Sequence, residues 1–567
     1  MRGTSGAWIV VMCAVVGCGD KPATELPPTP DATASALAEE AAAVIGEEGL
    51  RRDVSRLASD EFEGRGPGTA GDRMARSYLA SRLAEAGCEP AFADGSWEQP
   101  VEIVGLTTEL PELWSFRNDS GAEVSFKRRD EYIGGIGIQE PAAAFAEAPV
   151  VFVGYGIVAP EQGWDDFKGA DLEGAVLLML NDDPDWDPEL FGGERKLYYG
   201  RWDYKYESAA RQGAAAAVII HTTESAGYPW EVVQTGWTGE QFEVPAGDEP
   251  RLALRAWMTE DAARGLVAQA GRDLDELVAS ARSRDFAPVA LDLRTSLGLT
   301  ASVRSTETAN VGGIMRGHDP ELADEAVVIS AHHDHFGIGE PDASGDRIYN
   351  GALDNGVAMA QALSLAEAFA ALPERPHRSL LFLFVAAEEQ GLLGSKHFAR
   401  HPIFAPGKMA ANINFELGNV WGRTRDITIF GKGKSTLEDL LTEAAARQGR
   451  RVEEDTTPRA GWYYRSDQFS FASIGVPAIW FKSGTDFIGR PEGWGEARYA
   501  EWIAERYHRP GDEVQEDWNY EGLVEDARLA FELALEVAER DEMPAWYPGD
   551  EFEAERQRAL AEAAGTP

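Results

Sequence analysis

The sequence predicts an α/β fold with a mainly parallel, twisted sheet flanked by helices, into which a β-rich unit is inserted. From about residue 300 onward, uniformly apolar strands alternate with alanine-rich helices, a pattern typical of a parallel sheet that is covered on both faces. Between residues 120 and 298 the apolar runs favour β-strands. A length of 567 residues with 44% hydrophobic and 26% charged residues is ordinary for a globular chain of two to four domains.

The first 18 residues predict an export signal. Arg2 precedes a short apolar core at 7–16 (AWIVVMCAVV), which is too short to span a bilayer. The core leads to Val-Val-Gly-Cys18, which resembles the lipobox of bacterial lipoproteins and implies lipidation of Cys18; a plain secretory signal is the alternative. We expect an exported protein that contacts a membrane only through this lipid anchor on the cell envelope, at its periplasmic face or at the cell surface. Of the three cysteines, only Cys88 would then remain, so no internal disulfide is expected.

The remaining chain divides by composition. Residues 19–40, rich in Pro, Thr and acids, predict a flexible tether. The main α/β domain is predicted in two parts, 41–119 and 299–545, separated by the insert at 120–298; 546–567 is predicted to be an acidic, alanine-rich tail. In the second part we expect strands at 326–330, 379–386, 411–415 and 476–481, and helices at 357–371, 391–399, 437–448 and, as the last one, 521–540.

The net charge limits the possible partners. With 52 basic and 96 acidic residues, the formal charge is −44. Such a charge repels phosphate backbones, so no nucleic-acid partner is expected. The charge says nothing about the oligomeric state, which stays open.

Polar clusters follow several predicted strands. They lie at 331–337 (AHHDHFG), 349–357 (YNGALDNGV), 385–395 (VAAEEQGLLGS), 412–418 (NINFELG) and 506–512 (RYHRPGD). Taken singly, each has a simpler explanation: solvated histidines, a helix cap at Asp354, or an acidic pair at a helix start.

Taken together, the clusters predict a metal site. Parallel strands bring their carboxyl ends to one edge, where open α/β sheets bind ligands. Imidazole and carboxylate groups suit zinc, and five ligands with one free carboxylate are about what a two-metal hydrolytic site needs. Of the adjacent acids Glu388 and Glu389, one would bind metal while the other takes a proton from water.

The order of these motifs resembles the co-catalytic di-zinc aminopeptidase family, whose relatives include glutamate carboxypeptidase and the transferrin receptor. The loop at 64–69 (GRGPGT) and the run at 466–471 (SDQFSF) also fit. The resemblance covers residues 50–100 and 300–540 and implies a zinc-peptidase fold. It implies that two zinc ions are held by His332, Asp354, Glu389, Glu416 and His508, with Asp354 bridging.

The resemblance also implies roles for other residues. Glu388 would be the general base and Asp334 would orient His332. Glu416 departs from the family, because many members have Asp there, and Gln468 replaces a commoner His. We expect Tyr464 to contact substrate, with a place in the aromatic core as the alternative.

The insert is similar to a protease-associated domain, which several family members carry. The matching runs are 154–158 (GYGIV), 164–167 (WDDF) and 209–220 (AARQGAAAAVII).

The implied function is a zinc-dependent aminopeptidase that hydrolyses the N-terminal bond of peptides by means of a metal-bound hydroxide and Glu388. The alternatives are a di-zinc carboxypeptidase or amidase on the same fold, and a non-catalytic, receptor-like binding protein.

Overall fold

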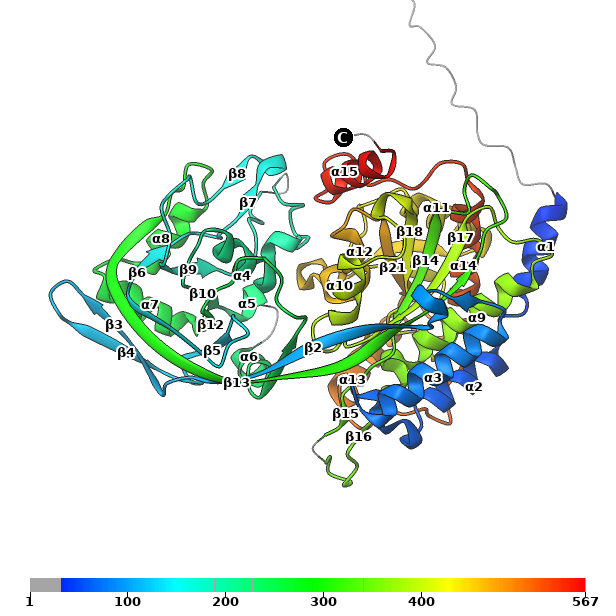
Figure 1. Ribbon diagram of the computed structural model, residues 1–567, viewed down its shortest axis with the longest axis horizontal. Coiled ribbons are helices and arrows are strands. Elements are labelled where there is room, and N and C mark those ends of the chain that lie inside the picture. Colours follow the sequence, from blue (N-terminus) through cyan, green and yellow to red (C-terminus); the bar gives the residue numbers. More distant parts are fainter. Residues whose placement is uncertain (1–31, 188–189, 227–228, 340, 566–567) are drawn as a thin grey trace, which may run out of the picture.

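The structure is a computed structural model that describes residues 32–187, 190–226, 229–339 and 341–565. Two lobes lie side by side and are joined by two long strands (Figure 1). Cys18 and the predicted signal and tether up to residue 31 lie outside the described residues. Within the described ranges, every helix is too short or too polar to cross a membrane.

The α/β lobe is built on a sheet whose four central strands are parallel. β14 (Ala326–His332) lies between β17 (Ser379–Val385) and β18 (Met409–Asn414), and β21 (Ala478–Ser483) follows β18. Antiparallel strands complete both sides: β13 (Val289–Met315) pairs with β17, and β19 (Asp426–Ile429) pairs with β21. β20 (Arg451–Glu454) forms the last pair with β19. The sheet is therefore mainly parallel, as predicted.

Helices cover both faces of this sheet because its strands are apolar on both sides. Val327 and Ile329 of β14 pack in one core cluster, whereas Val328 packs in another on the opposite face. The first face carries α1 (Ala32–Ala42), α2 (Glu47–Leu57), α3 (Ala70–Glu85), α9 (Val357–Ala371), α11 (Leu437–Arg447) and α14 (Glu521–Glu539). The second carries α10 (Leu393–Arg400) and α12 (Gln468–Ala472), on the side toward the other lobe (Figure 1).

The second lobe is β-rich and has its own apolar core. Its parallel strands β6 (Ala142–Phe152), β9 (Val176–Leu180), β10 (Ala216–His221) and β12 (Leu254–Thr259) pair in that order, and β5 (Tyr132–Ile136) adds to β12 antiparallel. The helices α4 (Trp202–Arg211), α7 (Glu260–Gln269) and α8 (Leu274–Ala281) pack beside this sheet.

Two strands connect the lobes without a flexible linker. β13 runs unbroken from Val289 to Met315 and pairs antiparallel with β2 (Glu98–Glu109) between the lobes (Figure 1). The predicted boundary at 298/299 falls inside β13. The boundary at 119/120 falls after β3 (Leu113–Asn118), in the turn to β4 (Glu123–Lys127). Trp114 of β3 is buried in the core of the β-rich lobe, so this lobe begins earlier in the chain than expected.

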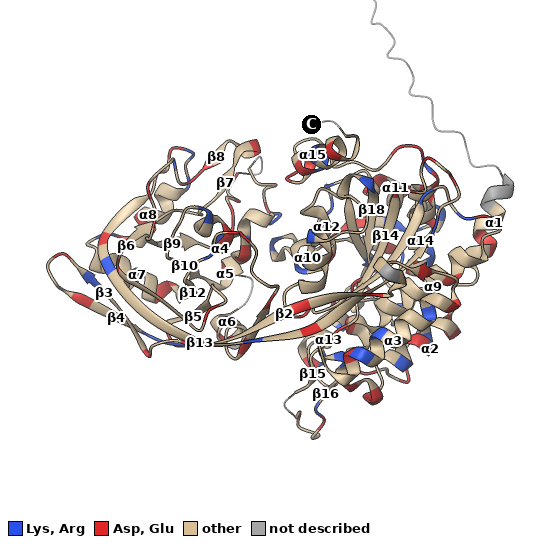
Figure 2. Cartoon of the chain, viewed as in Figure 1, with Lys and Arg blue, Asp and Glu red and all other residues tan. Residues whose placement is uncertain are grey.

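Two local expectations are wrong. The tether predicted at 19–40 is helical from residue 32 onward, where α1 begins. The helix at 521–540 is not the last one, because α15 (Glu553–Ala563) follows it within the predicted tail. Arg556 of α15 donates hydrogen bonds to the carbonyls of Pro406 and Met409, which fixes this helix on the α/β lobe. Acidic residues are spread over both lobes rather than gathered in one segment (Figure 2).

Candidate metal and catalytic site

The predicted ligands meet at the carboxyl edge of the α/β sheet. His332 ends β14, Glu389 lies four residues after β17, and Glu416 lies two residues after β18. Asp354 lies in the irregular turn 352–356 that leads into α9. His508 follows α13 (Trp494–Glu505). The parallel register of β14 with β17 and β18 is what brings residues so far apart in sequence to one place.

Asp354 lies between two histidines. Its Oδ1 is 3.2 Å from Nε2 of His332, and its Oδ2 is 3.3 Å from Nε2 of His508. On the first side, Glu416 Oε1 lies 3.4 Å from the same nitrogen of His332. On the second side, Glu389 Oε2 lies 3.2 Å from Nε2 of His508. This is the arrangement expected of one carboxylate shared by two neighbouring sites.

His335 is a further candidate ligand, which the sequence interpretation did not assign to the metals. Its Nδ1 is 2.6 Å from Glu389 Oε1, and the side chain is fully buried. His335, Asp354 and Glu389 form a group whose ligand atoms all lie within 4.8 Å of one another, as do His332, Asp354 and Glu416. Spacing along the sequence could not show that His335 contacts Glu389.

Glu388 and Asp334 differ from the ligands in their contacts. Oε2 of Glu388 lies 4.0 Å from Nε2 of His332, farther than the other carboxylates. The Asp334 carboxylate accepts hydrogen bonds from the backbone N–H of Glu388 at 2.9 Å and of Glu389 at 3.4 Å. Its distance of 3.8 Å from Nδ1 of His332 is too long for a hydrogen bond. Asp334 therefore orients the acidic pair at least as directly as the histidine.

The electrostatics of this cluster favour a bound cation. Burial, and then the neighbouring carboxylates, raise the pKa of Glu388 and of Glu389 well above the usual range. Burial alone would lower the pKa of His332, but Glu416 and Glu388 raise it well above its usual value. Buried like charges are costly unless cations offset them.

Three polar contacts fix the ligands in position. Ser466 donates to Glu416 Oε2 at 2.8 Å. Trp480 donates to the Glu416 carbonyl at 2.9 Å. The carboxylate of Asp512 accepts from the backbone N–H of Asp354 at 3.0 Å. Ser466 and Asp512 belong to motifs visible in the sequence, but their contacts depend on the fold.

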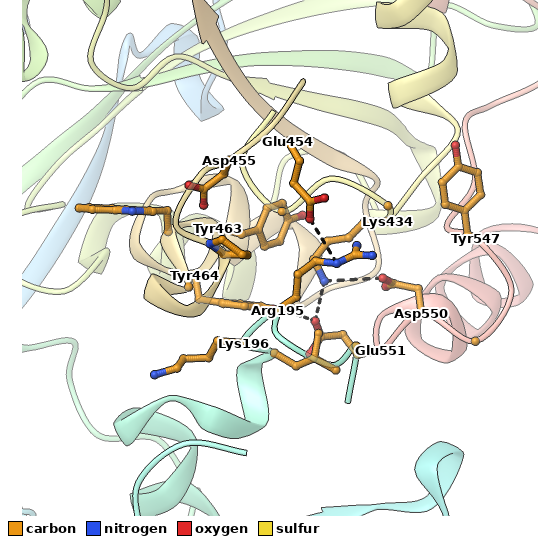
Figure 3. A pocket seen from close by; sticks show the side chains of 18 of the residues that line it. Arg195, Lys196, Lys434, Glu454, Asp455, Tyr463, Tyr464, Tyr547, Asp550 and Glu551 are labelled. Atoms are coloured by element: carbon orange, nitrogen blue, oxygen red, sulfur yellow. Dashed lines mark hydrogen bonds and ion pairs between the residues drawn. The ribbon is translucent and has the colours of Figure 1, made fainter. Parts of the chain in front are cut away.

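The residues around Tyr464 differ from those around the candidate ligands. It is buried, and its hydroxyl donates a hydrogen bond to Glu551 at 2.5 Å. Glu551 in turn pairs with Lys434 at 2.7 Å. Figure 3 shows these side chains around a pocket. The pocket is lined by segment 192–197 of the β-rich lobe and, in the α/β lobe, by residues between 431 and 464 and between 547 and 551. Substrate contact by Tyr464 stays a prediction.

The donor set fits zinc. Zinc binds imidazole nitrogen and carboxylate oxygen, and its catalytic sites typically have about three protein ligands and one open position. Here three groups of one histidine and two acids could hold an ion: two of them share Asp354, and the third joins His332 with Glu388 and Glu389.

A comparison with known families identifies one match. The family model described as "Peptidase family M28" matches residues 310–533, the part of the chain that carries all five predicted ligands.

Two curated relatives each match about a third of the chain. A vacuolar membrane protease of Verticillium alfalfae is 35% identical over 162 residues, which are 29% of this chain and 12% of that protein. A vacuolar membrane protease of Schizosaccharomyces japonicus is 28% identical over 188 residues, 32% of this chain and 17% of that protein. The chain thus spans less than a fifth of the length of these relatives.

Solved structures resemble the chain over most of its length. An aminopeptidase from Aneurinibacillus sp. strain AM-1 is 18% identical, covers 89% of this chain and 97% of its own, and has a TM-score of 0.49. A zinc aminopeptidase from Bacillus subtilis is 16% identical, covers 89% of this chain and 95% of its own, and has a TM-score of 0.38.

Proposed function

We propose that the peptidase family M28 domain carried by residues 310–533 is a zinc-dependent aminopeptidase that removes single residues from the amino end of peptides. The observation that carries this proposal is the position of Asp354 between two histidines, 3.2 Å from His332 and 3.3 Å from His508, with one further acid on each side. His332, Asp354 and Glu416 would hold one ion. Asp354, Glu389 and His508 would hold the other, with His335 beside them.

Zinc bound there would supply Lewis acidity, which lowers the pKa of a coordinated water and polarises the scissile carbonyl. Glu388 would take a proton from the attacking water while the water oxygen bonds to the scissile carbonyl carbon. It would then deliver that proton to the amine nitrogen as the C–N bond breaks, which leaves a carboxyl group and a free amine. Asp334 would keep Glu388 in place through its backbone N–H.

Preference for the amino end rests on charge. The buried cluster holds Asp354, Glu388, Glu389 and Glu416, so acids outnumber the histidines that face them. Two bound zinc ions would offset most of this charge, so the preference would come from Glu389 and Glu416, beside which a terminal amine can hydrogen-bond, and from the −44 formal charge of the chain. The alternative functions on the same fold are those of a carboxypeptidase, an amidase or a non-catalytic binding protein.

A panel of aminoacyl and carboxy-terminal reporter peptides, assayed with and without chelator, tests the activity. We expect hydrolysis from the amino end that chelation abolishes and zinc restores. Release from the carboxyl end would favour the carboxypeptidase, and bound zinc without any hydrolysis would favour a binding protein.

We further propose that the protein is exported and anchored by a lipid on Cys18, and that the β-rich lobe is a protease-associated domain. The Cys18→Ser variant should leave the membrane fraction. Wild-type protein that carries no lipid would contradict the anchor.

A further inference from the structure

Arg65 lies beneath the candidate metal site, between the segments that carry its ligands. The side chain is fully buried, and its backbone has a positive φ of 52°. The neighbouring Gly64 also has a positive φ, and a Cβ there would lie 2.4 Å from the carbonyl oxygen of Tyr349. This close approach of backbones allows the Arg65 side chain to enter the space below the turn that holds Asp354.

The guanidinium joins three segments of chain. Nε donates to the carbonyl of His333 at 2.8 Å, and Nη1 donates to those of Leu57 and Asn350 at 2.7 and 2.6 Å. Nη2 donates to the carbonyl of Gly351 at 2.9 Å. His333 follows the ligand His332 directly, and Gly351 lies three residues before Asp354. One side chain thus connects the end of β14, the turn before α9 and the end of α2.

The contacts of Arg65 are to backbone carbonyls rather than to acids. Among the described residues, no carboxylate lies within 4.0 Å of its guanidinium, although Asp334, Asp354 and Asp512 are near enough to influence it. Burial lowers its pKa to about 10, which still leaves the group charged at neutral pH. A fixed positive charge therefore lies below an acidic cluster without occupying any of its metal-binding oxygens.

We propose that Arg65 is a positioning residue for the metal centre: by donating to four carbonyls of three segments, it holds His332 and Asp354 at the separation that two metal sites require. This inference rests on the proposed function, because it assumes that these residues bind zinc. Lysine cannot replace Arg65, since its three N–H donors sit on one atom and cannot reach carbonyls on three sides.

The molecule offers a matched control at the other end of the same sheet. Arg378, directly before β17, is also buried and donates to the carbonyls of Val537 and Asp541 at 3.0 Å, and to Glu325 at 2.9 Å. The candidate ligand Glu389 follows the opposite end of β17. Loss of Arg378 removes a comparable set of buried hydrogen bonds at the amino ends of β14 and β17, whereas the candidate ligands lie at or beyond the carboxyl ends of these strands.

The test compares Arg65→Lys and Arg65→Met with Arg378→Lys and Arg378→Met in the full chain. Zinc affinity is measured by competition with a chromophoric chelator, in the absence of peptide, and folding by circular dichroism. Removal of a residue that orients ligands typically costs 10- to 100-fold in metal affinity. We expect a loss of about that size for folded Arg65→Lys, and unchanged zinc affinity for the Arg378 variants even where their thermal midpoints fall.

Three results would overturn the proposal: wild-type zinc affinity in folded Arg65→Lys, an equal loss of affinity in the Arg378 variants, or a wild-type chain that binds no zinc. Arg65→Lys keeps the charge and most of the volume, so its zinc affinity can be measured even if Arg65→Met does not fold. Because affinity is read without substrate, wild-type protein that binds zinc but hydrolyses no peptide would contradict the peptidase activity and not the role of Arg65.

Discussion

Glu388 and Glu389 are neighbours in the chain, yet their carboxylates have different contacts. Glu389 lies 2.6 Å from His335 and 3.2 Å from His508, whereas the nearest histidine nitrogen to Glu388 is 4.0 Å away. We therefore expect Glu388→Gln to keep its zinc and lose about 100- to 10,000-fold in turnover, because only the proton carrier is removed. Glu389→Gln should instead lose zinc from one site. Metal content and turnover of both variants decide this, and equal zinc loss in the two would reverse or discard the assignment.

Lys482 of β21 permits a prediction about pH. Its ammonium is buried 3.8 Å from the ring centre of Tyr499, and burial lowers its pKa to about 8. In the unfolded chain a lysine has a pKa of about 10.4. Between these values the unfolded state binds more protons, so this group adds stability as the pH rises from about 8 to 10.4.

The thermal midpoint of the wild type relative to Lys482→Met should therefore rise across that interval, as measured by scanning both proteins from pH 7 to 10. Lys408→Met, at a lysine that is more than a third exposed, is the control. Its thermal midpoint should change with pH in parallel with that of the wild type. A constant difference between wild type and Lys482→Met would show that Lys482 does not titrate there.

The sequence predicts those site residues that directly follow an apolar strand. His332, Glu389 and Glu416 follow apolar strands, and a parallel sheet must bring such ends together. His335 could not be assigned, because only the turn after β14 decides which histidine faces the acids. The carbonyls that Arg65 holds belong to the backbone and leave no trace in the sequence at all.

Elements with a strong local pattern agree well with their predictions. α9 spans Val357–Ala371, the predicted range, because an alanine-rich run between a glycine and a proline-containing turn leaves little choice. The start of α3 follows a common capping pattern, in which the Thr69 side chain accepts a hydrogen bond from the N–H of Asp72. The length of β13 could not be predicted, since a 27-residue strand, which has two register shifts between Ala290 and Leu297, is far longer than the typical five or six residues.

The α15 helix depends on tertiary contact, which explains why composition alone indicated a tail. It packs on the short turn Pro406–Lys408, where a Cβ on Gly407 would lie 2.2 Å from the carbonyl oxygen of Ala559. We expect Gly407→Ala to displace α15 and to cost about 1–3 kcal/mol, seen as a lower thermal midpoint. At Gly236 a Cβ meets nothing within 4 Å, so Gly236→Ala is the control. Equal midpoints for Gly407→Ala and the wild type would mean that α15 adjusts without strain.

At the scale of the whole molecule, the two lobes are held together by polar and aromatic contacts. The ring of Tyr198 from the β-rich lobe packs 4.7 Å from Phe469 of α12. Nearby, the N–H of Lys196 donates to the carbonyl of Pro458, and Arg459 pairs with Asp185 at 2.7 Å. The β-rich lobe is thus fixed against the side of the α/β lobe that carries α10 and α12 (Figure 1).

This arrangement leads to a prediction about substrates. If the β-rich lobe forms one wall of the cleft, it limits the room beyond the amino end of a bound peptide. An acetyl group adds bulk there and removes the basicity of the amine, which the acidic cluster around Asp354 and Glu389 would favour. We therefore expect acetylated peptides to be processed at least about ten times more slowly than free peptides of equal sequence, which corresponds to 1.4 kcal/mol in the barrier.

Matched free and acetylated peptides, incubated with the zinc-loaded protein and followed by mass spectrometry, measure this difference. Single residues should leave the free peptides one after another from the amino end. A peptide blocked at its carboxyl end by an amide is the control and should be trimmed as fast as the free one, because that end lies away from the proposed wall. Equal rates for free and acetylated peptides, or internal fragments, would mean that neither the acidic cluster nor the β-rich lobe selects the amino end.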